Sequence, residues 1–135
     1  SLGPFIRLLD DHFTMTDIRN ADLSLEVTGT DGYVLSGSST MRVISRDPED
    51  LAQQMFDCHQ YPDGAVLYTG TLFAPTDDRD RPGEGFTHKL GDVVRIASSR
   101  LGCLENVVGR SDTLPEWEDG ALALFRSLSK RGIAV

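Results

Sequence analysis

The chain has 135 residues, of which 39% are apolar and 25% are charged, and this composition is typical of one soluble globular domain. Its formal net charge of −8 argues against a nucleic-acid partner, because proteins that bind phosphate backbones normally carry a basic stripe. No apolar run approaches the roughly 20 residues that cross a bilayer, so we expect a cytoplasmic protein with no membrane partner.

The first regular pattern is an alternation of apolar and polar residues over 21–29. Polar side chains fall on one face of this segment, and the other face carries Leu23, Leu25 and Val27. Turn-forming residues follow at 29–32, and a short apolar run returns over 33–37. The sequence therefore predicts an antiparallel hairpin with one buried face.

The pattern then changes to a helical period. Asp47 is a suitable N-cap, Pro48 fits the first helical position, and a stripe of apolar residues follows at Leu51, Ala52, Met55 and Phe56. The sequence "YPDG" at 61–64 predicts a turn that ends this helix. The apolar run "AVLYTG" at 65–70 then predicts a short strand in the centre of the sheet.

A long segment without a periodic pattern extends over 71–91. Loops of this length in compact domains are usually functional or disordered, and the aromatic and proline residues Phe73, Pro75, Pro82 and Phe86 argue against disorder. His88 in this loop has two interpretations. Its imidazole is a candidate general acid or base, whereas "KLGD" at 89–92 is also typical of a tight turn, which we favour.

The last third of the chain predicts two strands and one helix. Strands are expected over 92–99 and 102–108, around a turn at 99–102. An amphipathic helix follows, capped by Gly132, with one apolar face formed by Ala121, Leu124, Phe125 and Leu128. Several strands with two helices indicate a β-rich α+β domain.

Cysteine and acidic residues give no convincing catalytic or metal-binding pattern. We expect Cys58 and Cys103 to be reduced and buried, with a disulfide as the alternative. Cys58 and His59 are adjacent on the predicted helix, so their side chains point about 100° apart and do not form a nucleophile–base pair. Glu116 and Glu118 diverge at the start of a helix, where its dipole stabilises them without a metal.

Two other places are better candidates for ligand binding. Arg79 or Arg81 would grip a carboxylate through a bidentate contact, although such charged runs are more often solvated loop surface. Gly70 and Thr71 follow the predicted central strand. A glycine there lets a ligand approach the backbone, and a threonine offers both its hydroxyl and its amide as donors.

Four stretches together resemble the C-terminal part of the fumarylacetoacetate hydrolase superfamily. They are "SLGPF", "DIRNADLSLEVTG", "YTGTLFAP" and "GEGFTHKLGDVVRIASSRLGCLENVV", and they cover nearly the whole chain in the order found in the family. The block "FAPT-DRD-PG-GFTHK-GDVV" and the later "ALALFRSLSKRG" are most similar to the 2-keto-3-deoxy sugar-acid dehydratase-like subgroup. The resemblance identifies residues 1–135 as a single domain that is the C-terminal portion of a catalytic domain.

The resemblance implies an α+β fold with a mixed β-sandwich roll, usually as a homodimer, and a divalent cation, generally Mg²⁺. In the family this ion chelates the 2-oxo-carboxylate of the substrate and stabilises an enolate during dehydration or C–C cleavage. The family's acidic ligands precede its "LGPF" stretch, so they are expected upstream of Ser1 in a complementary N-terminal part. Glu116 and Glu118 do not match those ligands, and no metal ligand is expected within this chain.

The resemblance also assigns the candidate binding residues. Thr71 matches the family's glycine–threonine pair that binds a substrate carboxylate, with Gly70 allowing close approach, whereas no catalytic role follows for His88. The implied reaction is dehydration of a 2-keto-3-deoxy sugar acid. The alternatives are hydrolysis of a C–C bond in an acylpyruvate-like or fumarylacetoacetate-like substrate, and a non-catalytic binding or assembly subunit.

Overall fold

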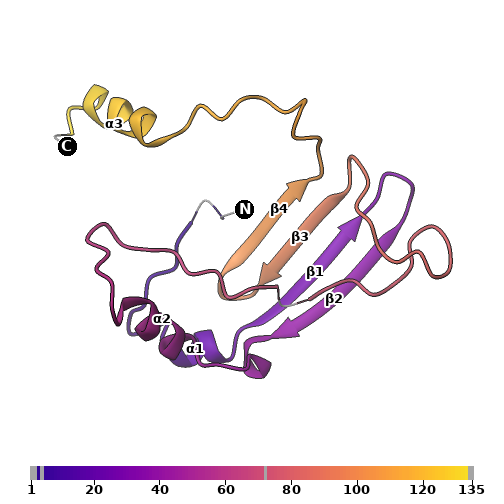
Figure 1. Cartoon of the computed structure of the whole chain (residues 1–135), viewed down its shortest axis with the longest axis horizontal. Helices are drawn as coiled ribbons and strands as arrows, with labels where there is room; N and C mark the ends of the chain where they lie inside the picture. Colours follow the sequence, from indigo (N-terminus) through magenta and orange to yellow (C-terminus); the bar gives the residue numbers. More distant parts are fainter. Residues whose placement is uncertain (1–2, 4, 72, 134–135) are drawn as a thin grey trace.

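The computed structural model describes residues 3, 5–71 and 73–133. These residues form an α+β domain with one four-stranded antiparallel sheet in the order β2-β1-β3-β4 (Figure 1). The strands are β1 (Asp22–Thr28), β2 (Val34–Thr40), β3 (Val93–Ser98) and β4 (Gly102–Val107). The helices are α1 (Met15–Arg19), α2 (Pro48–Phe56), α3 (Ala121–Lys130) and the 3-10 helix η1 (Met41–Val43). The described part thus has three α-helices instead of the two predicted, because α1 is too short to show a helical period.

The predicted hairpin is confirmed by β1 and β2. Their register pairs Leu25 with Gly37 and Val27 with Leu35, and the backbone N–H of Gly29 donates to the carbonyl of Tyr33 at 2.8 Å to close the turn. Burial alternates along β1, with Val27 only 1% exposed. The apolar side chains that alternate in the sequence therefore lie on the buried face.

The second predicted strand pair is confirmed by β3 and β4. These strands form a hairpin in which Ile96 pairs with Leu104. β3 also pairs with β1, and Ser24 lies opposite Ala97 in this register. The centre of the sheet is therefore the contact between two hairpins that are far apart in the sequence.

The central strand predicted at 65–70 is wrong. This segment has no regular secondary structure, and its large side chains Val66, Leu67 and Tyr68 are exposed. A central strand needs hydrogen-bonding partners on both sides, and β1 already has β2 and β3 as its neighbours. The apolar run therefore remains outside the sheet.

Both longer helices form where the sequence predicts them. Asp47 caps α2, because its carboxylate accepts the backbone N–H of Glu49 at 2.9 Å, and Pro48 occupies the first turn. Helix α3 ends before Gly132, which has a φ of 72°. The apolar face of α3 is open, with Leu124 and Phe125 both exposed.

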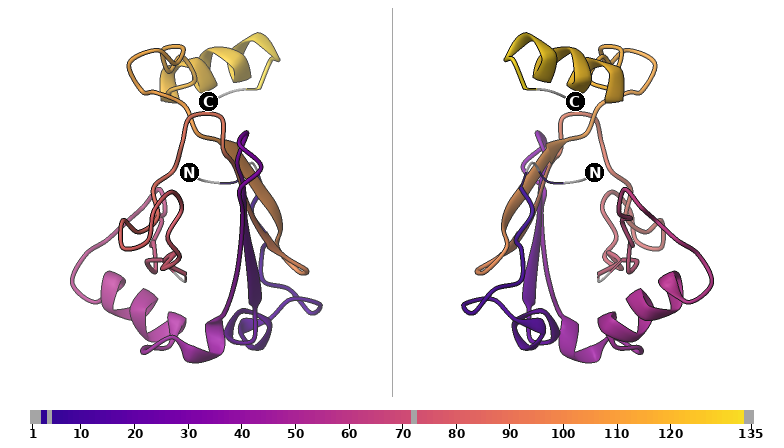
Figure 2. Two further views of the ribbon diagram at one scale, coloured as in Figure 1. Left: turned by 90° about the vertical axis from the view of Figure 1, so that its right-hand side faces the viewer. Right: turned by 90° about the vertical axis from the view of Figure 1, so that its left-hand side faces the viewer.

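The core is small and lies on the sheet and beside α1. Its buried apolar side chains are those of Phe13, Ala21, Val27 and Leu35. The guanidinium groups of Arg7 and Arg100 lie 5.0 and 5.6 Å from the centre of the Phe13 ring, so they enclose this side chain. In the two side views, the segment that joins β2 to β3 lies on one side of the sheet, and α3 lies beyond one end (Figure 2).

Among the described residues, no helix is both long enough and apolar enough to cross a membrane.

Candidate functional site

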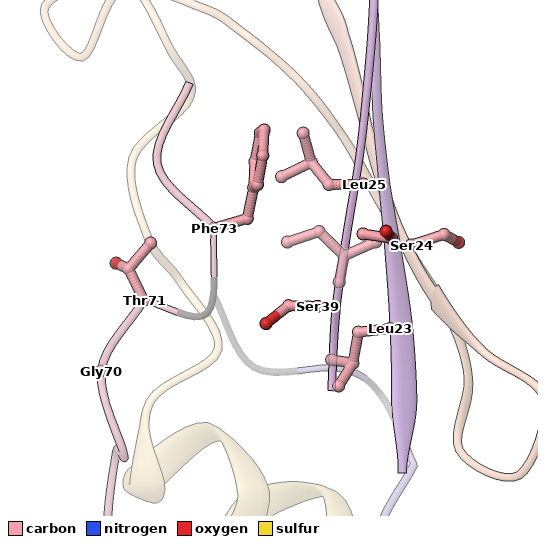
Figure 3. Close-up of a pocket in the computed structure, with 9 residues that line it drawn as sticks. Leu23, Ser24, Leu25, Ser39, Gly70, Thr71 and Phe73 are labelled. Carbon is pink, nitrogen blue, oxygen red and sulfur yellow. The ribbon is translucent and has the colours of Figure 1, made fainter. Parts of the chain in front are cut away.

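Gly70 and Thr71, together with Phe73, line a hollow of about 290 Å³ against the sheet (Figure 3). Phe73 closes one side of it, and the sheet contributes side chains from β1, β2 and β3, among them Leu23, Leu25, Ser39 and Ile96. The hollow therefore joins the glycine–threonine pair of the long loop to the predicted apolar face of the hairpin.

Phe73 fixes the loop against the sheet through a close approach to Gly37. A Cβ atom built at Gly37 would lie 2.6 Å from the ring atoms of Phe73, so a larger residue on β2 would displace the ring. In Figure 3 the ring stands beside Leu25 and faces the strands. The missing side chain at Gly37 thus makes room for an aromatic residue that closes the hollow.

The two sides of the hollow differ in chemistry. Leu23, Leu25 and Ile96 make its floor apolar, and the hydroxyl of Ser39 is a polar group there. Gly70 has a φ of 91°, a backbone conformation that favours glycine. Because glycine has no side chain, the backbone at the rim stays open. The Thr71 hydroxyl points away from the strands (Figure 3). The floor therefore suits the apolar body of a ligand, and the Thr71 hydroxyl is available only to a polar group at the outer side of the rim.

A second feature of the long loop is a buried ion pair between Arg79 and Asp92. Their side chains are 2% and 0% exposed. Both terminal nitrogens of Arg79 donate to Asp92, with Nη2 at 2.8 Å from Oδ1, and Nη2 also reaches Asp31 at 3.2 Å. The guanidinium lies 4.7 Å from the centre of the Tyr33 ring, and its Nε is buried with no hydrogen-bond acceptor among the described residues.

The charges of this cluster stabilise one another. The Arg79 guanidinium holds the pKa of Asp92 well below its usual value, and the Asp92 carboxylate raises the pKa of Arg79. The ammonium of Lys89 is the main cause that lowers the pKa of Asp31 to about 2, and the backbone N–H of Tyr33 is the second. The hydrogen bond to Asp80 is the main cause that raises the pKa of Lys89, and the hydrogen bond to Asp31 is the second. Arg79, Asp92, Asp31 and Lys89 are therefore ionised at neutral pH.

The loop around the cluster contains its own hydrogen bonds. Asp78 accepts the backbone N–H groups of Gly83 and Gly85 at 2.7 and 2.6 Å, and the Arg79 N–H donates to the Gly85 carbonyl at 3.2 Å. These contacts close residues 78–85 into a small ring, which gives the segment a defined shape without a helix or strand.

The turn predicted at 89–92 is confirmed. The backbone N–H of Lys89 donates to the Asp92 carboxylate at 2.8 Å, the Asp92 N–H returns to the Lys89 carbonyl at 3.1 Å, and Gly91 has a φ of 86°. His88 precedes this turn, with Nδ1 3.7 Å from Asp92 and its ring against Phe86 at 4.8 Å between centroids. In the described chain, His88 does not line the hollow.

The structure corrects the predicted surroundings of both cysteines and of the pair Glu116 and Glu118. Cys58 and Cys103 are free thiols, as predicted, but both are exposed and not buried, because Cys58 lies beyond the end of α2 and Cys103 on the edge strand β4. Glu116 and Glu118 lie outside the first turn of α3, because Gly120 begins the helix after them.

The residues described do not fit a metal site by themselves. No group of three or more His, Cys, Asp or Glu side chains gathers among them as it would around an ion. The carboxylates of Asp31, Asp80 and Asp92 around the loop already have Arg79 or Lys89 as partners.

The sequence singles out the glycine–threonine pair and Arg79 but does not indicate the partners of Arg79. In the sequence, Asp92 and Asp31 are residues of two separate predicted turns. Asp31 is 48 positions from Arg79, so no local pattern links the two residues. The only signal was the concentration of opposite charges in the long loop and the turn residues near it.

No protein-family model, curated protein or solved structure matches the chain, so the family resemblance depends on the sequence stretches alone.

Proposed function

We propose that the chain is the C-terminal portion of a fumarylacetoacetate hydrolase-like, metal-dependent enzyme that acts on 2-oxo acids. The observation that carries this proposal is the place of Gly70 and Thr71, the two residues matched to a carboxylate-binding pair, at the rim of a hollow on the sheet. The complete domain would be a mixed β-sandwich roll, formed with a complementary N-terminal part in a cytoplasmic homodimer.

Within this proposal the chain binds and orients the substrate. Thr71 offers its hydroxyl and its N–H to the substrate carboxylate, and Gly70 leaves the backbone accessible. The divalent cation, such as Mg²⁺, is assigned to residues outside this chain, since the described residues do not form its ligand set.

The reaction we propose first is dehydration of a 2-keto-3-deoxy sugar acid, which is the reaction implied by the subgroup. A second candidate is hydrolysis of a C–C bond in an acylpyruvate-like substrate, and the apolar floor formed by Leu23, Leu25 and Ile96 favours it. An acyl chain can lie on such a floor, whereas buried hydroxyl groups of a sugar acid need hydrogen-bond partners there. The lack of a metal-ligand group in the described chain favours the third candidate, a binding or assembly subunit without activity of its own.

The substitution Thr71→Val tests the proposed role of the hydroxyl. It keeps the shape of the side chain and removes one hydrogen bond to a charged group. In the complete enzyme we expect kcat/KM for the 2-oxo acid to fall by a factor that corresponds to roughly 1–3 kcal/mol. Thr69→Val, in the same exposed segment, is the control and is expected to have no effect.

Both substrate classes are assayed in this experiment. Turnover of a 2-keto-3-deoxy sugar acid but not of an acylpyruvate selects dehydration, and the reverse selects C–C hydrolysis. An unchanged kcat/KM in Thr71→Val would remove this residue from the site.

A further inference from the structure

Residues 73–88, which we call the strap, are attached to the sheet at two separate places. At one end, the Phe73 ring fills the space left by Gly37 on β2. At the other end, Arg79 enters a buried cluster formed by Asp31, Tyr33 and Asp92. Thr71 lies two residues before the first attachment, so its position depends on how the strap is held.

Arg79 makes contacts with groups from several parts of the fold. Asp92 immediately precedes β3, Asp31 belongs to the β1–β2 turn, and Tyr33 immediately precedes β2. Nη1 also donates to the carbonyl of Thr87 within the strap at 3.2 Å. One side chain thus ties the strap to the turn of the first hairpin and to the start of the second.

The same contacts leave no accessible face of Arg79 for a substrate. Its side chain is 2% exposed, and both terminal nitrogens already donate to carboxylates. The backbone also packs tightly here, because a Cβ atom at Gly29 would lie 2.5 Å from Nη2. A bidentate contact of Arg79 with an external carboxylate would require the Asp92 pair to break and would leave a buried charge without its partner.

We propose that Arg79 is a positioning residue: it anchors the strap to the sheet and thereby holds Phe73, Thr71 and the rim of the hollow in place. The effect of Arg79 on catalysis rests on the proposed role of Thr71 in binding the substrate carboxylate. The effect of Arg79 on the position of Phe73 does not rest on that role, because it follows from the two attachments alone.

The variant Arg79→Lys tests the anchor. Lysine keeps the positive charge beside Asp92 but lacks the planar fork that contacts Asp92 through two nitrogens and reaches Asp31 at the same time. The matched control is Arg110→Lys. Arg110 also contacts one aspartate, Asp112, through two nitrogens, but this pair is exposed.

The first measurement uses the chain labelled with 4-fluorophenylalanine and observed by ¹⁹F NMR. The resonance of Phe86 reports on the cluster, because this ring contacts His88 and Tyr33, and the resonance of Phe73 reports on the first attachment. In Arg79→Lys we expect both resonances to shift or broaden, and in Arg110→Lys neither. A change at Phe86 with an unchanged Phe73 resonance would overturn the proposal, since the cluster would then be a local structural feature.

The second measurement is a double-mutant cycle in the complete enzyme with the 2-oxo acid substrate. We expect Arg79→Lys to lower kcat/KM by roughly 10- to 100-fold, because the carboxylate-binding group is misplaced and not removed. If Arg79 acts through Thr71, the double variant Arg79→Lys/Thr71→Val is no worse than Thr71→Val alone. Losses that multiply would show that Arg79 acts independently of Thr71, which contradicts the proposal.

The two measurements separate failure of this inference from failure of the proposed function. If no 2-oxo acid is turned over by the unmodified enzyme, the proposed function fails, and the ¹⁹F spectra still decide whether Arg79 positions Phe73. If Arg79→Lys does not fold, Asp31→Asn replaces it, because Asp31 is a half-exposed member of the cluster. We expect Asp31→Asn to shift or broaden the resonances of both Phe86 and Phe73, by less than is expected for Arg79→Lys. No change at Phe73 would overturn the proposal.

Discussion

Asp92 combines complete burial with a full negative charge, and its partner Arg79 is the main reason that its pKa lies well below the usual value. The backbone N–H of Lys89 at 2.8 Å also favours the charged form. Breaking such a pair from one side is costly, because the remaining charge stays buried without compensation. The cluster should therefore respond to acid more strongly than the exposed ion pairs.

We expect stability to be constant from pH 7 to about 5 and to fall below about pH 4. Asp31, Asp47 and Asp92 have lower pKa values in the folded chain than the ordinary aspartate value of about 4. The unfolded chain thus binds more protons as the pH falls, and acid favours unfolding. Melting temperatures measured across this range check the prediction.

The contribution of Asp92 can be isolated by Asp92→Asn, which we expect to lower the melting temperature at pH 7 and to flatten the decline below pH 4. Asp112→Asn is the matched control, because its pair with Arg110 is exposed and screened by water. Equal effects of the two substitutions would contradict the importance of burial at Asp92.

At the scale of elements, α2 depends on a cap that has two functions. One carboxylate oxygen of Asp47 accepts the N–H of Glu49 at 2.9 Å, and the same side chain forms an ion pair with Arg19. The cap therefore begins the helix and also connects it to α1. In the apolar stripe of α2, Leu51, Ala52 and Met55 are half-buried and Phe56 is exposed, so these polar contacts are a notable part of what holds the helix in place.

The substitutions Asp47→Asn and Asp47→Ala separate the two functions of this cap. Asparagine retains the capping oxygen and loses the charge, whereas alanine loses both. We expect Asp47→Ala to reduce the free energy of unfolding by about 1 kcal/mol more than Asp47→Asn, as measured by urea denaturation. Equal losses would mean that the ion pair with Arg19 carries the whole effect.

The elements with a local pattern could be predicted from the sequence. Leu23, Leu25 and Val27 alternate as a half-buried strand requires, and Asp47 with Pro48 marks the start of α2. The strand predicted at 65–70 was wrong because its apolar composition contains no information about which strand it would pair with. Sheet position depends on distant partners, and β1 pairs instead with β3.

The candidate site could be predicted only in part for the same reason. The glycine–threonine pair is a short motif, so it was visible in the sequence, whereas the apolar floor combines side chains from three strands. The fixing of Phe73 by Gly37 was not predicted, because a glycine inside a strand does not indicate which distant ring approaches it.

At the scale of the whole molecule, apolar side chains remain open over much of the surface. Trp117 is 85% exposed, and Leu122, Leu124 and Phe125 are exposed on α3. Exposed apolar side chains in such number commonly mark protein–protein contacts. This surface supports the proposal that the chain works together with a complementary part and a second copy.

Magnesium binding provides a test at this scale. The described residues contain no cluster of ligands, so we expect titration of Mg²⁺ into the isolated 135-residue chain to give no heat of binding in isothermal calorimetry. The same titration into the complete enzyme should show binding. Saturable binding to the isolated chain would contradict the assignment of the metal to residues outside it.

The strand order has a consequence for the time course of folding. Each hairpin closes over a short turn, but β1 meets β3 only after residues 41–92 have been brought back to the sheet, as the pairing of Ser24 with Ala97 shows. Local closure is fast, and distant pairing is slow because a long loop loses more conformational entropy when its ends meet. We therefore expect each hairpin to form before β1 pairs with β3, and this distant pairing to limit the rate at which the native sheet is completed.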